Sequence, residues 1–177
     1  KFLLKDPMAS YKLAKRLYEH KLYDLAARIS DLLLASLPKN AENKELLLKE
    51  SGDWHAKANE IDAANARYQE YLAAYKNNGE FTNAVSESLD ALFFKTKENN
   101  ETVLENYYDK LIEKYSNDIG QKALLEKTNL LFKQKRFTDV LALEEALSKV
   151  PDNFEIKPAE LIYGSVQALA LTALPSG

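Results

Sequence analysis

The stretch I-D-A-A-N-A-R-Y-Q-E-Y-L-A-A-Y at residues 61–75 decides the fold. Its apolar and aromatic residues return at every third or fourth position, as they do along one face of a helix. Forty residues further on the same pattern returns. Leu104, Tyr108, Leu111, Ile112 and Tyr115 there match Ala64, Tyr68, Tyr71, Leu72 and Tyr75. Such a repeat predicts stacked two-helix units, an architecture whose general work is to bind other macromolecules.

The composition indicates a folded, helical chain. Of the 177 residues, 46% are hydrophobic and 29% are charged, which is ordinary for a globular protein. Five glycines and five prolines leave little material for the many turns of an all-β fold. We therefore expect an all-α protein.

Charge and hydropathy exclude several classes of partner. With 24 basic against 27 acidic residues the net charge is -3, so the basic surface that binds nucleic acid is missing. No apolar run reaches the roughly 20 residues of a membrane span, so we expect no membrane insertion. The chain contains no cysteine, which excludes disulfides and leaves both cytoplasm and periplasm open. It begins at Lys1 without a signal sequence, and we expect it to be part of a longer protein.

Amphipathic stripes and helix-end signals predict about nine helices in four hairpins and one last helix. The hairpins are expected at 6–38, 41–78, 81–116 and 118–151, and the last helix at 158–171. Within the hairpins, helices are expected at 41–58, 82–97, 101–115 and 137–150 as well as at 61–75. Asp118 and Gln121 have the spacing of a capping box and are expected to open the first helix of the fourth hairpin.

Two features predict how these helices pack. A glycine inside a helix costs about 1 kcal/mol relative to alanine, so we expect Gly52 to allow close approach of the helix at 61–75. The last helix carries an apolar face without a following helix to cover it. That face consists of Leu161, Ile162, Val166, Leu169 and Ala170. We expect it to fold back on the helix at 137–150 or to cause self-association.

Helical hairpins that recur at 36 to 40 residues resemble the tetratricopeptide superfamily, whose usual period is about 34. The first hairpin carries the resemblance in Ala14, Leu17, Tyr23, Ala26 and Pro38, and the second in Gly52, Ala64, Tyr68 and Leu72. The later hairpins depart from it, with Leu92 and Thr128 where a small residue is usual and Leu104 and Val140 where alanine is usual. The resemblance implies a right-handed α-solenoid, with looser crossings at those four positions.

A second resemblance lies in E-N-N-E-T at residues 98–102, which contains the acceptor pattern Asn-x-Thr at Asn100. An acidic residue two positions before the asparagine is typical of N-glycosylation in Campylobacter and its relatives, where the modification is periplasmic. The chain also has 20 lysines against four arginines, and 13 asparagines. Together these features resemble periplasmic scaffold proteins of the bacterial flagellar motor. They imply a periplasmic location, with the cytoplasm as the alternative.

No pattern for catalysis, metal binding or cofactor binding is present. His20 and His55 lack the spacing of metal ligands, and we interpret both as surface residues. The five glycines never cluster into a phosphate-binding loop. Glu144 and Glu145 are consecutive on a helix, so their side chains diverge and cannot flank one substrate bond. We expect a protein that is not an enzyme, with no cofactor and no small-molecule substrate.

The expected binding surface is the concave groove of the solenoid, formed by the first helix of each hairpin. Its residues are predicted to be Tyr11, Lys15, Tyr18, Lys49, Asp53, Phe93, Lys97, Leu125, Asn129 and Phe132. The leading hypothesis is a non-catalytic scaffold that binds a folded envelope or motor protein. The alternative is a soluble adaptor or chaperone module that receives an extended peptide in the groove. Core packing of the groove aromatics is weighed evenly against binding.

Overall fold

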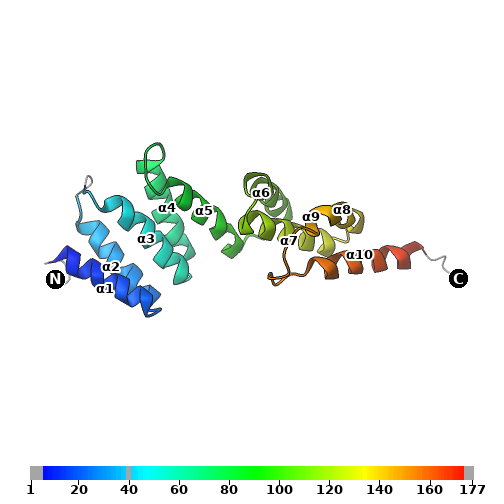
Figure 1. Cartoon of the computed structure of the whole chain (residues 1–177), viewed down its shortest axis with the longest axis horizontal. Helices are drawn as coiled ribbons and strands as arrows, with labels where there is room; N and C mark the ends of the chain where they lie inside the picture. Colours follow the sequence, from blue (N-terminus) through cyan, green and yellow to red (C-terminus); the bar gives the residue numbers. More distant parts are fainter. Residues whose placement is uncertain (1–5, 39–40, 174–177) are drawn as a thin grey trace. The chain divides into compact units, whose positions relative to one another are not determined.

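The computed structural model describes residues 6–38 and 41–173, and every regular element within them is a helix (Figure 1). The helices are α1 (Pro7–Glu19), α2 (Tyr23–Ser36), α3 (Lys44–Lys57), α4 (Ile61–Tyr75), α5 (Thr82–Leu92), α6 (Glu101–Lys114), α7 (Asp118–Lys133), α8 (Phe137–Ala142), α9 (Glu144–Leu147) and α10 (Pro158–Ala173). A short 3₁₀ helix, η1 (Phe93–Lys95), follows α5. The prediction of an all-α fold is confirmed, while the right-handed solenoid stays a prediction.

The chain divides into two compact units, Lys1–Thr96 and Lys97–Gly177. In unit 1, each of the helices α1 to α4 packs against the next one along the chain. In unit 2, α6 packs against α7, and α10 packs against α8 and α7. The division falls inside the predicted third hairpin, at the end of η1.

One turn recurs in three of the hairpins. Lys21, Asn59 and Lys135 have positive φ angles of 62°, 62° and 60°. The first two lie 38 residues apart, and the third follows at twice that spacing. In each turn the next N–H bonds to the carbonyl five residues back: Leu22 to Leu17 (2.9 Å), Glu60 to His55 (2.9 Å) and Arg136 to Leu131 (3.0 Å). This is the left-handed helix ending of a Schellman motif, so the repeat seen in the sequence is also a repeat of the backbone.

Gly52 is the packing glycine that the sequence predicts. It is buried on α3, and a Cβ there would collide with the ring of Tyr68 on α4, with Cδ1 only 2.5 Å away. Tyr68 is itself 1% exposed and cannot easily move aside. Because Gly52 has no side chain, α3 and α4 can approach closely at this residue.

The looser crossings expected at Thr128 and Val140 do not leave gaps open to solvent. Both side chains are fully buried. The hydroxyl of Thr128 donates to the carbonyl of Leu124 in its own helix at 2.7 Å, so a polar group is accommodated without a partner from another helix.

Several predicted helix ends are wrong. Helix α3 begins at Lys44 rather than at residue 41, and α5 ends at Leu92 rather than at 97. At the end of η1, the N–H and the hydroxyl of Thr96 both donate to the carbonyl of Phe93, at 3.0 and 2.8 Å, which closes the segment with a tight turn. The helix expected at 137–150 is divided at Leu143 into α8 and α9.

The residue that caps α7 is Asn117, not Asp118. The Oδ1 atom of Asn117 accepts a hydrogen bond from the N–H of Ile119 at 3.0 Å, and its backbone is extended. Asp118 is the first helical residue, where its negative charge still favours the helix N-terminus.

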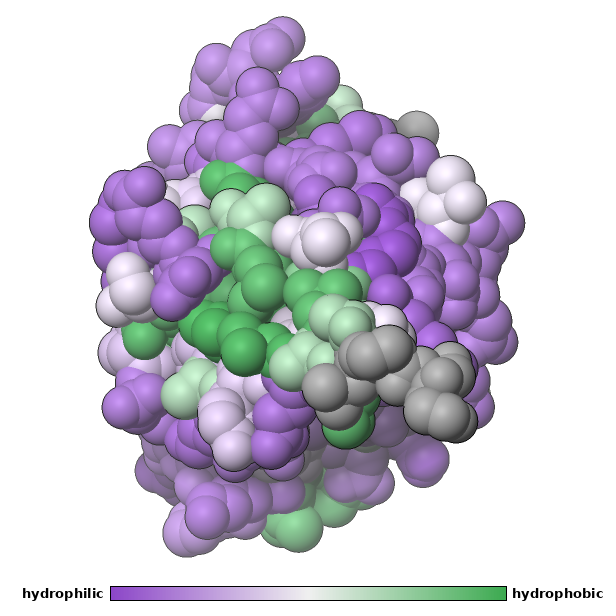
Figure 2. Space-filling view, turned by 90° about the vertical axis from the view of Figure 1, so that its right-hand side faces the viewer, coloured by the Kyte–Doolittle hydropathy of each residue, from purple (hydrophilic) through white to green (hydrophobic). Residues whose placement is uncertain are grey.

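The last helix, α10, folds back on α8, which is one of the two expected outcomes. Leu161 is buried, and Gly164 lies against the ring of Phe132 on α7, which a Cβ would approach to 3.0 Å. Tyr163, Val166 and Leu171 remain 65%, 50% and 71% exposed. Figure 2 shows an apolar patch on the side of the molecule where α10 ends.

Candidate functional site

Four of the predicted groove residues line one pocket of unit 1. Lys15 and Tyr18 come from α1, and Lys49 and Asp53 come from α3. The remaining lining residues are Glu19, Glu50 and Trp54. The pocket has a volume of about 280 Å³ and is partly open to solvent. We name it the α1–α3 pocket.

The helical period explains why these side chains meet. Lys15 and Tyr18 lie three residues apart on α1, and Lys49 and Asp53 lie four apart on α3, so each pair shares one face of its helix. Between the helices, the rings of Tyr18 and Trp54 approach to 5.9 Å between centroids. Trp54 is 3% exposed and forms the apolar wall of the pocket.

Both carboxylate oxygens of Asp53 accept a hydrogen bond within unit 1. Its Oδ2 atom accepts from Nζ of Lys49 at 2.6 Å, and its Oδ1 atom accepts from the hydroxyl of Tyr68 at 2.6 Å. The Lys49 ammonium also lies 6.0 Å from the ring centroid of Phe81. Asp53 and Lys49 thus link the pocket to α4, and both are held in place.

Glu50 is paired much less tightly. Its side chain is only 15% exposed, and its Oε1 atom lies 3.6 Å from Nζ of Lys15, beyond hydrogen-bond length. Its Oε2 atom is buried and has no hydrogen-bond partner. Burial raises the pKa of Tyr11, and so does the hydrogen bond from its hydroxyl to the Glu50 side chain together with the negative charge of that carboxylate. A buried acceptor without a donor costs free energy, and this one lies beside the pocket.

Buried tyrosines join the helices of unit 1. Burial is the first cause that raises the pKa of Tyr68 above its ordinary value, and the adjacent Asp53 carboxylate adds to it. Burial also raises the pKa of Tyr71, whose hydroxyl donates to Oε1 of Glu45 at 2.6 Å. The phenols are therefore held neutral in the folded protein.

This arrangement predicts unfolding of unit 1 in alkali. An unfolded tyrosine loses its proton near pH 10, whereas folded Tyr68 and Tyr71 keep theirs to higher pH. The stability from the neutral phenols is thus fully present below about pH 10 and is lost as the pH rises through the folded pKa values. As the pH rises, we expect tyrosinate absorbance to increase while the helical circular dichroism signal decreases over the same pH range. In Tyr68→Phe the two changes should coincide less closely. Ordinary tyrosine titration with intact helices would contradict this.

The other predicted groove residues lie elsewhere. Tyr11 lines a separate apolar pocket of about 160 Å³ with Met8, Leu33 and Leu47 among its walls. Phe93 is half-buried in η1, and Lys97 is exposed in the connection before α6. The structure therefore joins four of the ten residues into one site.

In unit 2 the predicted groove face of α7 is partly covered by the chain itself. Leu125 is 1% exposed in a core cluster onto which Phe154 and Ile156 pack. Phe132 packs on Phe137, with ring centroids 5.4 Å apart, and on Gly164 of α10. Asn129 is half-buried on the same helix. The segment after α9 returns over α7 and leaves Leu125 almost fully buried, at the floor of a pocket of about 370 Å³ that Lys122, Glu126, Phe154 and Ile156 also line.

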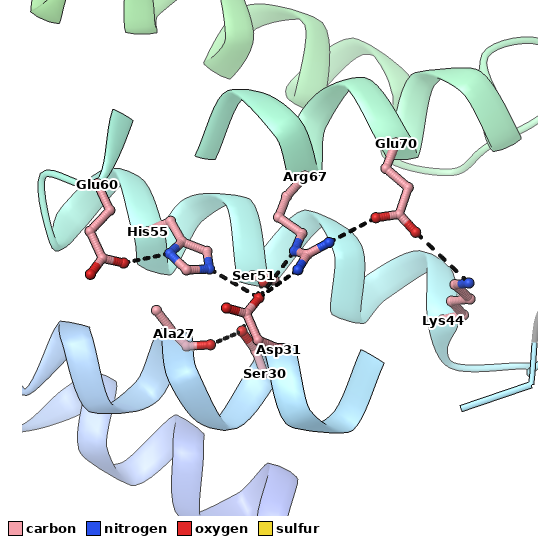
Figure 3. A network of polar contacts seen from close by, with 9 residues as sticks. All are labelled: Ala27, Ser30, Asp31, Lys44, Ser51, His55, Glu60, Arg67 and Glu70. Atoms are coloured by element: carbon pink, nitrogen blue, oxygen red, sulfur yellow. Dashed lines mark hydrogen bonds and ion pairs between the residues drawn. The ribbon is translucent and has the colours of Figure 1, made fainter. Parts of the chain in front are cut away.

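His55 is buried, so its interpretation as a surface residue is wrong. It is 4% exposed, and its ring nitrogens contact two carboxylates, Nδ1 with Glu60 at 2.6 Å and Nε2 with Asp31 at 3.1 Å (Figure 3). Arg67 donates to the same Asp31 oxygen at 2.8 Å. This network connects α2, α3 and α4. Within residues 6–38 and 41–173, no cluster of three histidine, cysteine or carboxylate side chains is arranged to hold a metal ion.

Asn100 is exposed and caps α6. Its Oδ1 atom accepts from the N–H groups of Thr102 at 3.1 Å and Val103 at 3.3 Å. Oε1 of Glu98 accepts from the N–H groups of Asn99 and Asn100 at 2.8 and 2.7 Å. The acidic residue of the glycosylation pattern thus has a local structural role, and the side-chain nitrogen of Asn100 takes no part in these bonds.

Comparison with models of known protein families gives no match, and comparison with curated proteins gives none either. Among the described helices, none combines the length and hydropathy needed to cross a membrane.

Proposed function

We propose that this chain is a non-catalytic protein-interaction module that binds a polypeptide partner at the α1–α3 pocket. The observation that carries this proposal is the convergence of Lys15, Tyr18, Lys49 and Asp53 on one open pocket. A concavity between helices lets a partner bury surface without ordering a loop, so little conformational entropy is lost on binding.

The chemistry of the pocket supports recognition rather than catalysis. Two of its charged groups, Lys49 and Asp53, hold each other at 2.6 Å and are not arranged to activate a nucleophile. Tyr18 is half-buried against Trp54 and Tyr23, with its ring 5.1 Å from that of Tyr23. A rigid aromatic next to charged side chains is the usual composition of a binding hot spot.

The leading form of this proposal is a scaffold that binds a folded component of the bacterial envelope or flagellar motor. The lysine and asparagine content and the pattern around Asn100 support it, because they are similar to those of paralysed flagellum protein A (PflA), a periplasmic motor scaffold. On this proposal the chain works in the periplasm. An exposed Asn100 is compatible with its modification there.

The second candidate is an adaptor or chaperone module that holds an extended peptide. The size of the α1–α3 pocket favours it, since about 280 Å³ accommodates a few side chains rather than a folded surface. The two candidates differ in partner. A scaffold needs a large interface, whereas an adaptor binds a short peptide.

Capture of partners from a native envelope extract, with identification by mass spectrometry, tests the proposal. Tyr18→Ala should weaken capture of a partner by about 1 kcal/mol or more, while helical content is retained. Tyr107→Ala, which truncates a half-buried tyrosine of unit 2, is the matched control and should leave capture unchanged. If capture by the Tyr18 variant merely follows its unfolded fraction, Tyr18 is a core residue and the proposed site is wrong.

A further inference from the structure

We infer that the α1–α3 pocket receives a basic side chain, an arginine or a lysine, of its polypeptide partner. This inference rests on the proposed function and adds the chemistry by which the partner is recognised. Two observations carry it, the charge balance of the pocket and the unpaired oxygen of Glu50.

The charge balance of the pocket is negative. Three carboxylates, those of Glu19, Glu50 and Asp53, face two ammonium groups, those of Lys15 and Lys49. Because Lys49 is engaged with Asp53 at 2.6 Å, it has little attraction left for a ligand anion. An acidic partner would have to break that contact and lie beside the carboxylates, whereas a basic partner meets the excess charge directly.

Glu50 supplies the acceptor. Its Oε2 atom has no hydrogen-bond partner, and its Oε1 atom lies 3.6 Å from Nζ of Lys15. The Tyr11 hydroxyl also interacts with this carboxylate. The Lys15 side chain is 49% exposed, so it can turn into solvent and uncover the carboxylate at little cost. Because Oε2 is buried, the carboxylate has to turn before an incoming guanidinium can donate one N–H group to each oxygen. Two charge-assisted hydrogen bonds then replace one long ion pair.

The pocket contains its own reporter of occupancy. Trp54 lines the pocket and is the only tryptophan of the chain. Its ring lies 5.9 Å from that of Tyr18, so a group entering beside them changes the surroundings of the indole. Fluorescence of the unmodified chain therefore reports on binding beside Trp54.

The experiment titrates the full chain with three matched peptides, acetyl-Ala-Ala-X-Ala-Ala-amide with X as arginine, glutamate or leucine, at constant ionic strength. The arginine peptide should change Trp54 fluorescence saturably, and the glutamate and leucine peptides should not. Glu50→Gln keeps the shape and removes the charge, and should weaken the arginine peptide about tenfold. Glu113→Gln, an exposed carboxylate of α6, is the control and should bind like the parent chain.

Several results would overturn the inference: equal binding of the leucine or glutamate peptide, no saturable change with the arginine peptide, or unaltered binding by Glu50→Gln with its helical content intact. The proposed function is judged separately. If Tyr18→Ala still weakens capture of a protein partner in those cases, the pocket binds polypeptide by another chemistry. If capture is also insensitive to Tyr18, both proposals fail.

Discussion

Replacement of Gly52 by leucine is expected to destabilise unit 1 by about 3 kcal/mol, the upper end of what overpacking costs. Leucine would enter the space of the Tyr68 ring, which is 1% exposed and tied through its hydroxyl to Asp53 at 2.6 Å. Even Gly52→Ala should not be mild, because the collision already involves Cβ. Thermal unfolding followed by circular dichroism measures the effect.

Ala66→Leu is the matched control for Gly52→Leu. Ala66 is an exposed position in the middle of α4, so the same added side chain meets solvent there. We expect its melting temperature to be close to that of the parent chain. An unchanged melting temperature for Gly52→Leu would mean that α3 and α4 do not cross at this residue.

Tyr71→Phe should lower the free energy of unfolding by about 1 to 3 kcal/mol, the cost of leaving buried polar groups unsatisfied. The Tyr71 hydroxyl donates to Glu45 at 2.6 Å and accepts from the N–H of Phe81 at 2.8 Å. It thereby joins α3 and α4 to the residue that precedes α5. Its removal leaves the Phe81 N–H without this acceptor.

A double-mutant cycle between Tyr71→Phe and Glu45→Gln measures how much of the lost stability comes from the hydrogen bond between these two residues. If they interact, the two losses in free energy of unfolding do not add up in the double variant. Tyr75→Phe is the control. Tyr75 lies next in line on α4, with its ring 5.3 Å from that of Tyr71, and its hydroxyl takes no part in this chain of hydrogen bonds. Equal effects of Tyr71→Phe and Tyr75→Phe would contradict the account of how α5 is attached.

The sequence predicts best those elements that have a strong local signal. Helix α4 begins at Ile61 and ends at Tyr75, as the apolar period indicates. The glycine at position 52 marks the place where α3 and α4 cross closely. Both conclusions need only residues that are neighbours on one helix face. The pairing of Lys15 and Tyr18 with Lys49 and Asp53 follows from the same periodicity, applied to two helices.

Features that depend on distant segments were not predictable in this way. Leu125 looked like a groove residue because nothing in residues 151–157 shows that Phe154 and Ile156 return to pack on its cluster. His55 looked exposed because its partners, Asp31 and Glu60, have no spacing that identifies them as ligands of one ring. Long-range contacts of this kind override local pattern.

The recurring turn also shows where the repeat fails. By its 38-residue spacing, a further left-handed residue is due at Lys97, between Asn59 and Lys135. There α5 has already ended in η1, and residues 97–100 connect to α6 without helix. The division between the two units falls at this point, Thr96 to Lys97. A sequence shift of forty residues aligns the helices on both sides of this division. It does not reveal that η1 and a non-helical connection take the place of the recurring turn.

The measurement that tests the central claim most directly is amide hydrogen exchange of the chain with and without a captured partner. Binding at the α1–α3 pocket predicts slower exchange around Lys15 and Tyr18 on α1 and around Lys49 and Asp53 on α3, with little change in α6 to α10. Slower exchange confined to unit 2, with α1 and α3 unaffected, would contradict the claim that this pocket is the binding site.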